Sequence, residues 1–85
     1  MKNEQQSAPA FSKQLGNIRV AVWRNEVNGR TYYNTTLTRQ YRDKDEQFQE
    51  SNSFNGQADL VLVQSAASQA AEWIDAQERA TANEA

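Results

Sequence analysis

Cationic and aromatic side chains are interleaved in one part of the sequence, between Lys13 and Lys44. This stretch holds seven basic residues and two acidic ones, whereas the rest of the chain holds two basic and nine acidic ones. The basic residues are Lys13, Arg19, Arg24, Arg30, Arg39, Arg42 and Lys44, and the rings among them are Trp23, Tyr32, Tyr33 and Tyr41. Because cations pair with phosphates and flat rings stack on bases, this combination is typical of a nucleic-acid-binding surface.

The composition argues against an enzyme. The chain has 85 residues with no cysteine and no histidine, which removes disulfides, zinc–thiolate sites and the usual general base. Its three glycines are scattered and form no phosphate-binding loop, and its hydroxyl side chains have no histidine to activate them. We therefore predict no catalytic residues, no metal and no cofactor.

The length predicts one small domain, at residues 16–80. Residues 1–15 are polar and aperiodic, which predicts a disordered tail, and residues 81–85 are expected to fray. The sequence has no long apolar run, so we expect no membrane span and a cytoplasmic location.

A β-hairpin is the clearest local prediction. Apolar residues alternate with others from Ile18 to Val22, which indicates a strand with one buried face. Asn28-Gly29 then favours a two-residue type I′ turn, and residues 31–42 resemble a second strand. This turn places Val27 opposite Arg30 and thereby sets the whole register.

A third strand and a helix are expected to follow. The charged residues 43–46 predict a four-residue turn, residues 47–54 a strand, and residues 57–80 a helix. The expected cross-strand pairs are Arg42 with Gln47, Tyr41 with Phe48 and Arg39 with Glu50. The helix residues expected to face the sheet are Leu60, Val63, Ala67, Ala70, Ala71 and Ile74, flanked by Leu62, Ala66 and Trp73.

The predicted fold is α+β: a three-stranded antiparallel β-meander with one C-terminal α-helix packed on one sheet face. One helix covers one face only, so the other face stays open unless a second copy closes it. A chain this short also buries only about 60–65% of its unfolded surface. We therefore predict a homodimer or a higher homo-oligomer.

The chain resembles a group of small bacterial proteins of unassigned function over residues 17–76. The runs that carry the resemblance are IRVAVWRN, NGRTYYNTTLTRQYRD and FQESNSF, followed by an alanine-rich helix that ends in Trp73-Ile74. Its order of strands and helix is also similar to the positive-cofactor-four coactivators and to the whirly proteins. This likeness of layout implies a dimer that binds unpaired DNA on its sheets, although the coactivator fold has four strands.

Two functions fit these features. The first is a non-enzymatic, dimeric module that binds single-stranded DNA or RNA, as an accessory in transcription or replication. Its expected contacts are Arg19, Trp23, Arg24, Arg30, Tyr32 and Arg42. The second is a structural or adaptor protein whose open sheet face mediates self-assembly or binds a protein partner. A weaker third reading is a small-molecule site in a groove between subunits.

Overall fold

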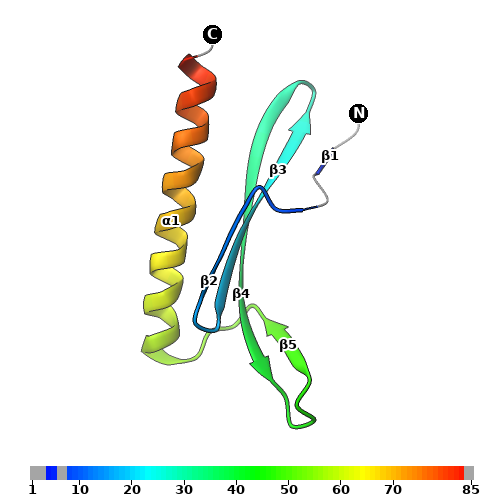
Figure 1. The fold of residues 1–85 in the computed structure, drawn as a ribbon, viewed down its shortest axis with the longest axis vertical. Helices are drawn as coiled ribbons and strands as arrows, with labels where there is room; N and C mark the ends of the chain where they lie inside the picture. Colours follow the sequence, from blue (N-terminus) through cyan, green and yellow to red (C-terminus); the bar gives the residue numbers. More distant parts are fainter. Residues whose placement is uncertain (1–3, 6–7, 84–85) are drawn as a thin grey trace.

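An antiparallel sheet and one long helix make up the protein (Figure 1). The computed structural model describes residues 4–5 and 8–83. The elements are β1 (Glu4–Gln5), β2 (Phe11–Leu15), β3 (Ile18–Val27), β4 (Arg30–Arg42), β5 (Phe48–Ser51) and α1 (Gly56–Asn83). Strands β2, β3, β4 and β5 are neighbours in that order, and the two-residue β1 pairs with the far end of β3. The fold is α+β, with α1 packed along one face of the sheet.

The central β3–β4 hairpin has the predicted register. Asn28 and Gly29 both have positive φ, at 55° and 77°, as a type I′ turn requires. Val27 lies opposite Arg30, and the pairing continues without interruption to Ile18 opposite Arg39. The alternation of the two faces along β3 and β4 is therefore also as predicted.

The prediction of three strands is wrong, because β2 adds a fourth. Phe11 and Leu15 are the two apolar residues of β2, and both pack against the buried core. The ring of Phe11 stacks on that of Trp73 in α1, with 5.6 Å between the centroids. This contact explains why a largely polar segment is ordered. The predicted tail is wrong for residues 11–15, and also for residues 4–5, which pair with β3. Residues 1–3 and 6–7 of that tail lie outside the described residues.

The predicted register between β4 and β5 is wrong by one residue. Arg42 lies opposite Phe48, and Arg39 lies opposite Ser51. The cause is a three-residue loop in which the Glu46 N–H donates to the Asp43 carbonyl, and Glu46 adopts a φ of 59°. A type I turn followed by a left-handed residue is a common hairpin connection. Glycine usually occupies this left-handed position. Because glutamate occupies it here, the sequence did not indicate the three-residue loop.

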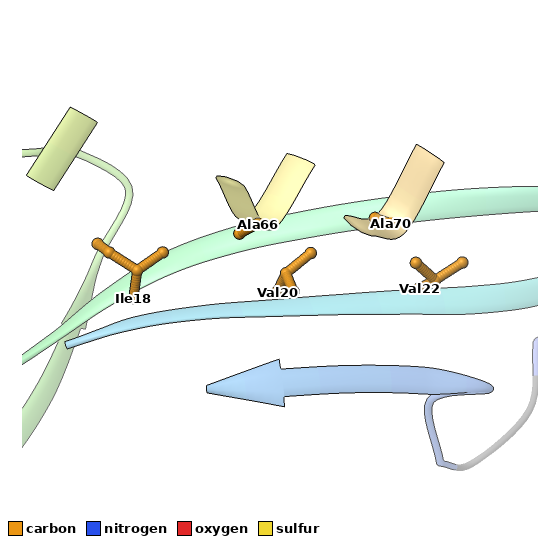
Figure 2. Close-up of a cluster of buried hydrophobic side chains, with 5 residues drawn as sticks. All are labelled: Ile18, Val20, Val22, Ala66 and Ala70. Atoms are coloured by element: carbon orange, nitrogen blue, oxygen red, sulfur yellow. The ribbon is translucent and has the colours of Figure 1, made fainter. Parts of the chain in front are cut away.

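The core is small and lies between β3 and α1 (Figure 2). Figure 2 shows the side chains of β3 pointing toward two alanines of the helix. The fully or almost fully buried core residues are Ile18, Val20, Val22, Ala66 and Ala70. Alanine lets the helix backbone approach the strand closely, so three aliphatic side chains are covered by very short partners.

The predicted sheet-facing side of the helix is only partly right. Val63, Ala70 and Ile74 pack against the core, but Leu60 is 55% exposed, and Ala67 and Ala71 are also exposed. The apolar side of α1 is therefore wider than the part of the helix that contacts the sheet. The helix is also longer than predicted, because residues 81–83 are helical; residues 84–85 lie outside the described part.

Asp59 joins three parts of the fold near the start of α1. Its carboxylate accepts hydrogen bonds from the Asn55 backbone N–H at 2.8 Å and from Asn17 Nδ2 at 3.2 Å. Arg39 Nε lies 3.9 Å from the same carboxylate, so the predicted pairing of Arg39 with Glu50 is wrong. The Asn55 N–H, then the Asn17 amide, and more weakly the charge of Arg39 lower the pKa of Asp59.

Candidate nucleic-acid interface

The sheet face directed away from α1 is the candidate interface, and we call it the open face. Side chains alternate between the two faces of a strand, so the pairing defines its members. From β3 they are Arg19, Ala21, Trp23, Asn25 and Val27; from β4, Arg30, Tyr32, Asn34, Thr36, Thr38, Gln40 and Arg42; and from β5, Phe48 and Glu50. Helix α1 lies on the opposite face, so a ligand can reach most of these side chains.

Three aromatic rings belong to the open face. Trp23 is half-buried, and its indole Nε1–H points to the hydroxyl oxygen of Thr36 at 3.4 Å. Tyr32 is 51% exposed and Phe48 is 72% exposed. Sequence reasoning identified Trp23 and Tyr32 but missed Phe48, because the one-residue error in register placed it on the other face beside Tyr41.

A hollow on the open face lies beside Arg19 and Trp23 of β3. Its volume is about 190 Å³, and the lining residues are Arg19, Ala21, Trp23, Thr36, Thr38 and Glu50. The small side chain of Ala21 lies between Arg19 and Trp23 on the same strand, where a larger residue would fill the space. Pockets for small molecules usually measure about 300–1,000 Å³, so the hollow suits one flat group better than an enclosed ligand.

Arg42 presents a guanidinium beside an exposed ring at the far end of β4. Its Cζ atom lies 4.8 Å from the centroid of Phe48, a cation–π contact. Its Nη1 atom is 3.7 Å from the carboxylate of Glu46, but both side chains are well exposed, at 60% and 83%. An exposed ion pair of this kind contributes little and exchanges easily for a phosphate.

The predicted contacts form a line and not a cluster. Arg30 begins β4 and Arg42 ends it, so about 40 Å of extended strand separates them. Arg19, Trp23 and Tyr32 lie between these two ends on the same face. Arg24 does not join them, because it faces the α1 side and pairs with Glu26, with 2.7 Å between Nη2 and Oε2. A ligand that contacts the whole set must therefore be extended.

The charges of the molecule are divided between its two sides. Within the described residues, the open face carries Arg19, Arg30 and Arg42 against the single acid Glu50. The exposed charges of the second half of α1 are Glu72, Asp75, Glu78 and Arg79. A chain with a formal net charge of −2 thus keeps a positive stripe on its sheet. Such a stripe attracts an anionic polymer from a distance at low salt.

Neither a cluster of metal-ligating side chains nor a membrane-spanning helix occurs within residues 4–5 and 8–83. No group of three acidic side chains is placed there to hold a metal ion. Helix α1 lacks the long apolar stretch needed to cross a bilayer. Comparisons of the chain with protein-family models, curated proteins and solved structures give no significant match. The argument for function therefore depends on the open face alone.

Proposed function

We propose that this protein is a non-enzymatic module that binds single-stranded nucleic acid along the open face. One observation carries the proposal: three arginines and three rings lie in a line on a sheet face that α1 leaves uncovered. Trp23, Tyr32 and Phe48 would stack on bases, and Arg19, Arg30 and Arg42 would pair with phosphates.

A single strand fits this surface better than a duplex does. Stacking on Trp23 or Phe48 requires bases that are unpaired and turned outward. The open face belongs to a sheet and carries no helix that could enter a major groove.

The rival function, self-assembly through the open face, is less well supported. Two copies placed face to face would bring Arg19, Arg30 and Arg42 close to the same arginines of the partner. Among the described residues of this face, Glu50 is the single acid that could compensate on each copy. Like charges facing each other in an interface are costly. The rival predicts that Trp23 fluorescence is blue-shifted and shielded from quenchers in the pure protein, whereas the proposed function predicts a quencher-accessible Trp23.

Fluorescence anisotropy with a labelled oligothymidine tests the proposed function. We expect binding at about 50 mM salt that weakens steeply by about 200 mM. Tyr32→Ala should weaken binding about 5- to 150-fold, as expected for the loss of 1–3 kcal/mol of stacking. Tyr41→Ala is the matched control, because Tyr41 is an exposed ring on the other face.

Two outcomes would reject the proposed function. One is the absence of binding at low salt. The other is an affinity that Trp23→Ala and Tyr32→Ala both leave unchanged. A duplex of the same length should bind more weakly than the single strand, because its bases are stacked and paired.

A further inference from the structure

Strand β4 has an edge that no described strand covers. β5 pairs only with residues 39–42, and Figure 1 shows it beside one end of β4. The remaining residues, 30–38, pair with β3 on one side and have no described partner on the other. An open edge of this length is a template for pairing with another chain.

The direction of the backbone groups along this edge follows from one hydrogen bond. The Ala10 N–H donates to the Val22 carbonyl, so the β3 residues that face α1 direct their backbone groups toward β2. The β3 residues that face away from α1 therefore direct their backbone N–H and C=O groups toward β4. On β4, the residues that face α1 then direct N–H and C=O groups away from β3. These residues are Thr31, Tyr33, Thr35 and Leu37.

The edge lacks the features that normally prevent pairing. Residues 31–38 contain no charged residue, no proline and no glycine, and Thr and Tyr favour strands. The opposite edge of the sheet is different, because β2 has only five residues and carries Lys13 at its centre. Of these two edges, β4 is the one suited to pair.

An apolar flank of α1 lies on the same side as this edge. Leu62 approaches Gly16 and Trp73 stacks on Phe11, which turns these two helix residues toward β2. The flank on the other side, above β4, then follows from helical spacing. Its residues are Leu60, Val63, Ala67, Ala71 and Ile74. Of these, Leu60, Ala67 and Ala71 are exposed although none is polar.

The protein is also more extended, and exposes more surface, than a compact protein of its mass. Its radius of gyration is 15.3 Å, whereas a compact chain of this length has about 12 Å. Its accessible surface is 6284 Å², against about 5,100 Å² for a compact 9.7 kDa protein. The excess is larger than the roughly 800 Å² that each partner buries in an ordinary interface. The surface that a stable dimer needs is thus present.

We infer that two copies of this chain pair through the β4 edges, in antiparallel register about a two-fold axis at Asn34. This register places Thr31 opposite Leu37 and Tyr33 opposite Thr35 of the second copy, and it uses all four outward-directed residues. The sheet becomes continuous, both helices lie on one side, and both open faces lie on the other. The two helices would stand about 14 Å apart, three strand spacings, with the apolar flanks facing each other.

The pairing would double the candidate interface without covering it. Tyr32 lies two residues from the two-fold axis, opposite Thr36 of the second copy, so the rings of both copies belong to one continuous face. An extended single strand could then cross from one copy to the other. The inference itself does not depend on nucleic acid, so its test is made with the protein alone and remains separate from that of the proposed function.

Disulfide trapping tests the register directly, because the chain has no native cysteine. Asn34→Cys places two cysteines in a non-hydrogen-bonded antiparallel pair, whose Cα atoms are about 4.5 Å apart, within the range for a disulfide. We expect Asn34→Cys to form a covalent dimer under mild oxidation. Ser12→Cys, on β2 at the opposite edge, should stay monomeric under denaturing conditions.

Light scattering with Thr35→Pro provides an independent readout. The parent protein should have twice the 9.7 kDa chain mass at micromolar concentration. Thr35→Pro removes an N–H that points away from β3, so it should give a folded monomer with unchanged circular dichroism. A monomeric parent protein, or a dimer trapped by Ser12→Cys and not by Asn34→Cys, would overturn the inference.

Discussion

The ring of Phe11 lies stacked on the ring of Trp73, with 5.6 Å between the centroids and 27° between the planes. Tyr33 meets the same indole edge-on, also at 5.6 Å. Trp73 therefore connects α1 to an edge strand and to the central hairpin at once. This cluster extends a core whose most deeply buried residues are three aliphatic residues and two alanines.

Phe11→Ala should lower the free energy of unfolding by about 2 kcal/mol, because it removes a half-buried ring from this cluster. Phe48→Ala is the matched control: Phe48 is 72% exposed, so its loss should cost less than about 0.5 kcal/mol. Urea denaturation followed by circular dichroism measures both. Equal stabilities for the two variants would mean that β2 does not hold the core.

The loop between β4 and β5 predicts a stabilising substitution. Glu46 has a φ of 59°, a conformation that costs less for glycine than for glutamate. Glu46→Gly should raise the free energy of unfolding by up to about 1 kcal/mol. Lys44 in the same loop does not have a positive φ, so Lys44→Gly relieves no strain and should lower the free energy of unfolding. Thermal unfolding of both variants gives the answer, and destabilisation by Glu46→Gly would contradict the loop geometry.

The hydrogen bonds to Asp59 predict how stability depends on pH. The Asn55 N–H, and after it the Asn17 amide, hold the pKa of Asp59 below its usual value. Because the pKa is lower in the folded state, this stabilisation is complete above the pKa of the unfolded state, about 4. It is lost as the pH falls through the pKa of the folded state. Asp59→Asn should therefore reduce stability at neutral pH and flatten its decline in acid.

The control for this measurement is Asp75→Asn. Asp75 is exposed, and its one ion pair among the described residues is with Arg79, at 3.0 Å on the surface of α1. This variant should retain the acid dependence of the parent protein. Denaturation curves collected between about pH 2 and pH 7 compare the variants. An identical acid decline for Asp59→Asn and the parent would show that Asp59 carries no such stabilisation.

The hairpin and the side of the sheet that α1 covers could be read from the sequence, because Asn28-Gly29 and a period-two pattern determine both. Strand β2 could not be predicted in this way, because only its two end residues are apolar. They pack against the core, where Phe11 stacks on Trp73, a residue distant in the sequence. The register of β5 failed for a similar reason, because a left-handed glutamate shortened the loop by one residue. That error hid Phe48 and placed Glu50 away from Arg19.

The charges of the open face predict opposite effects of two substitutions on oligothymidine binding. Arg42→Gln should reduce the slope of log affinity against log salt by about 0.7, the value for one phosphate contact of a single strand. Glu50→Gln removes the only acid of this face within the described residues, so it should strengthen binding. Arg79→Gln, on α1, is the control and should leave the slope unchanged.

Photo-cross-linking of oligothymidine to the protein, followed by mass spectrometry of the peptides, tests the central claim most directly. The account predicts cross-links at Trp23, Tyr32 and Phe48, and fewer at Tyr33 and Trp73 on the helix side. Cross-links concentrated on α1 or on the helix side of the sheet, or none at low salt, would contradict it.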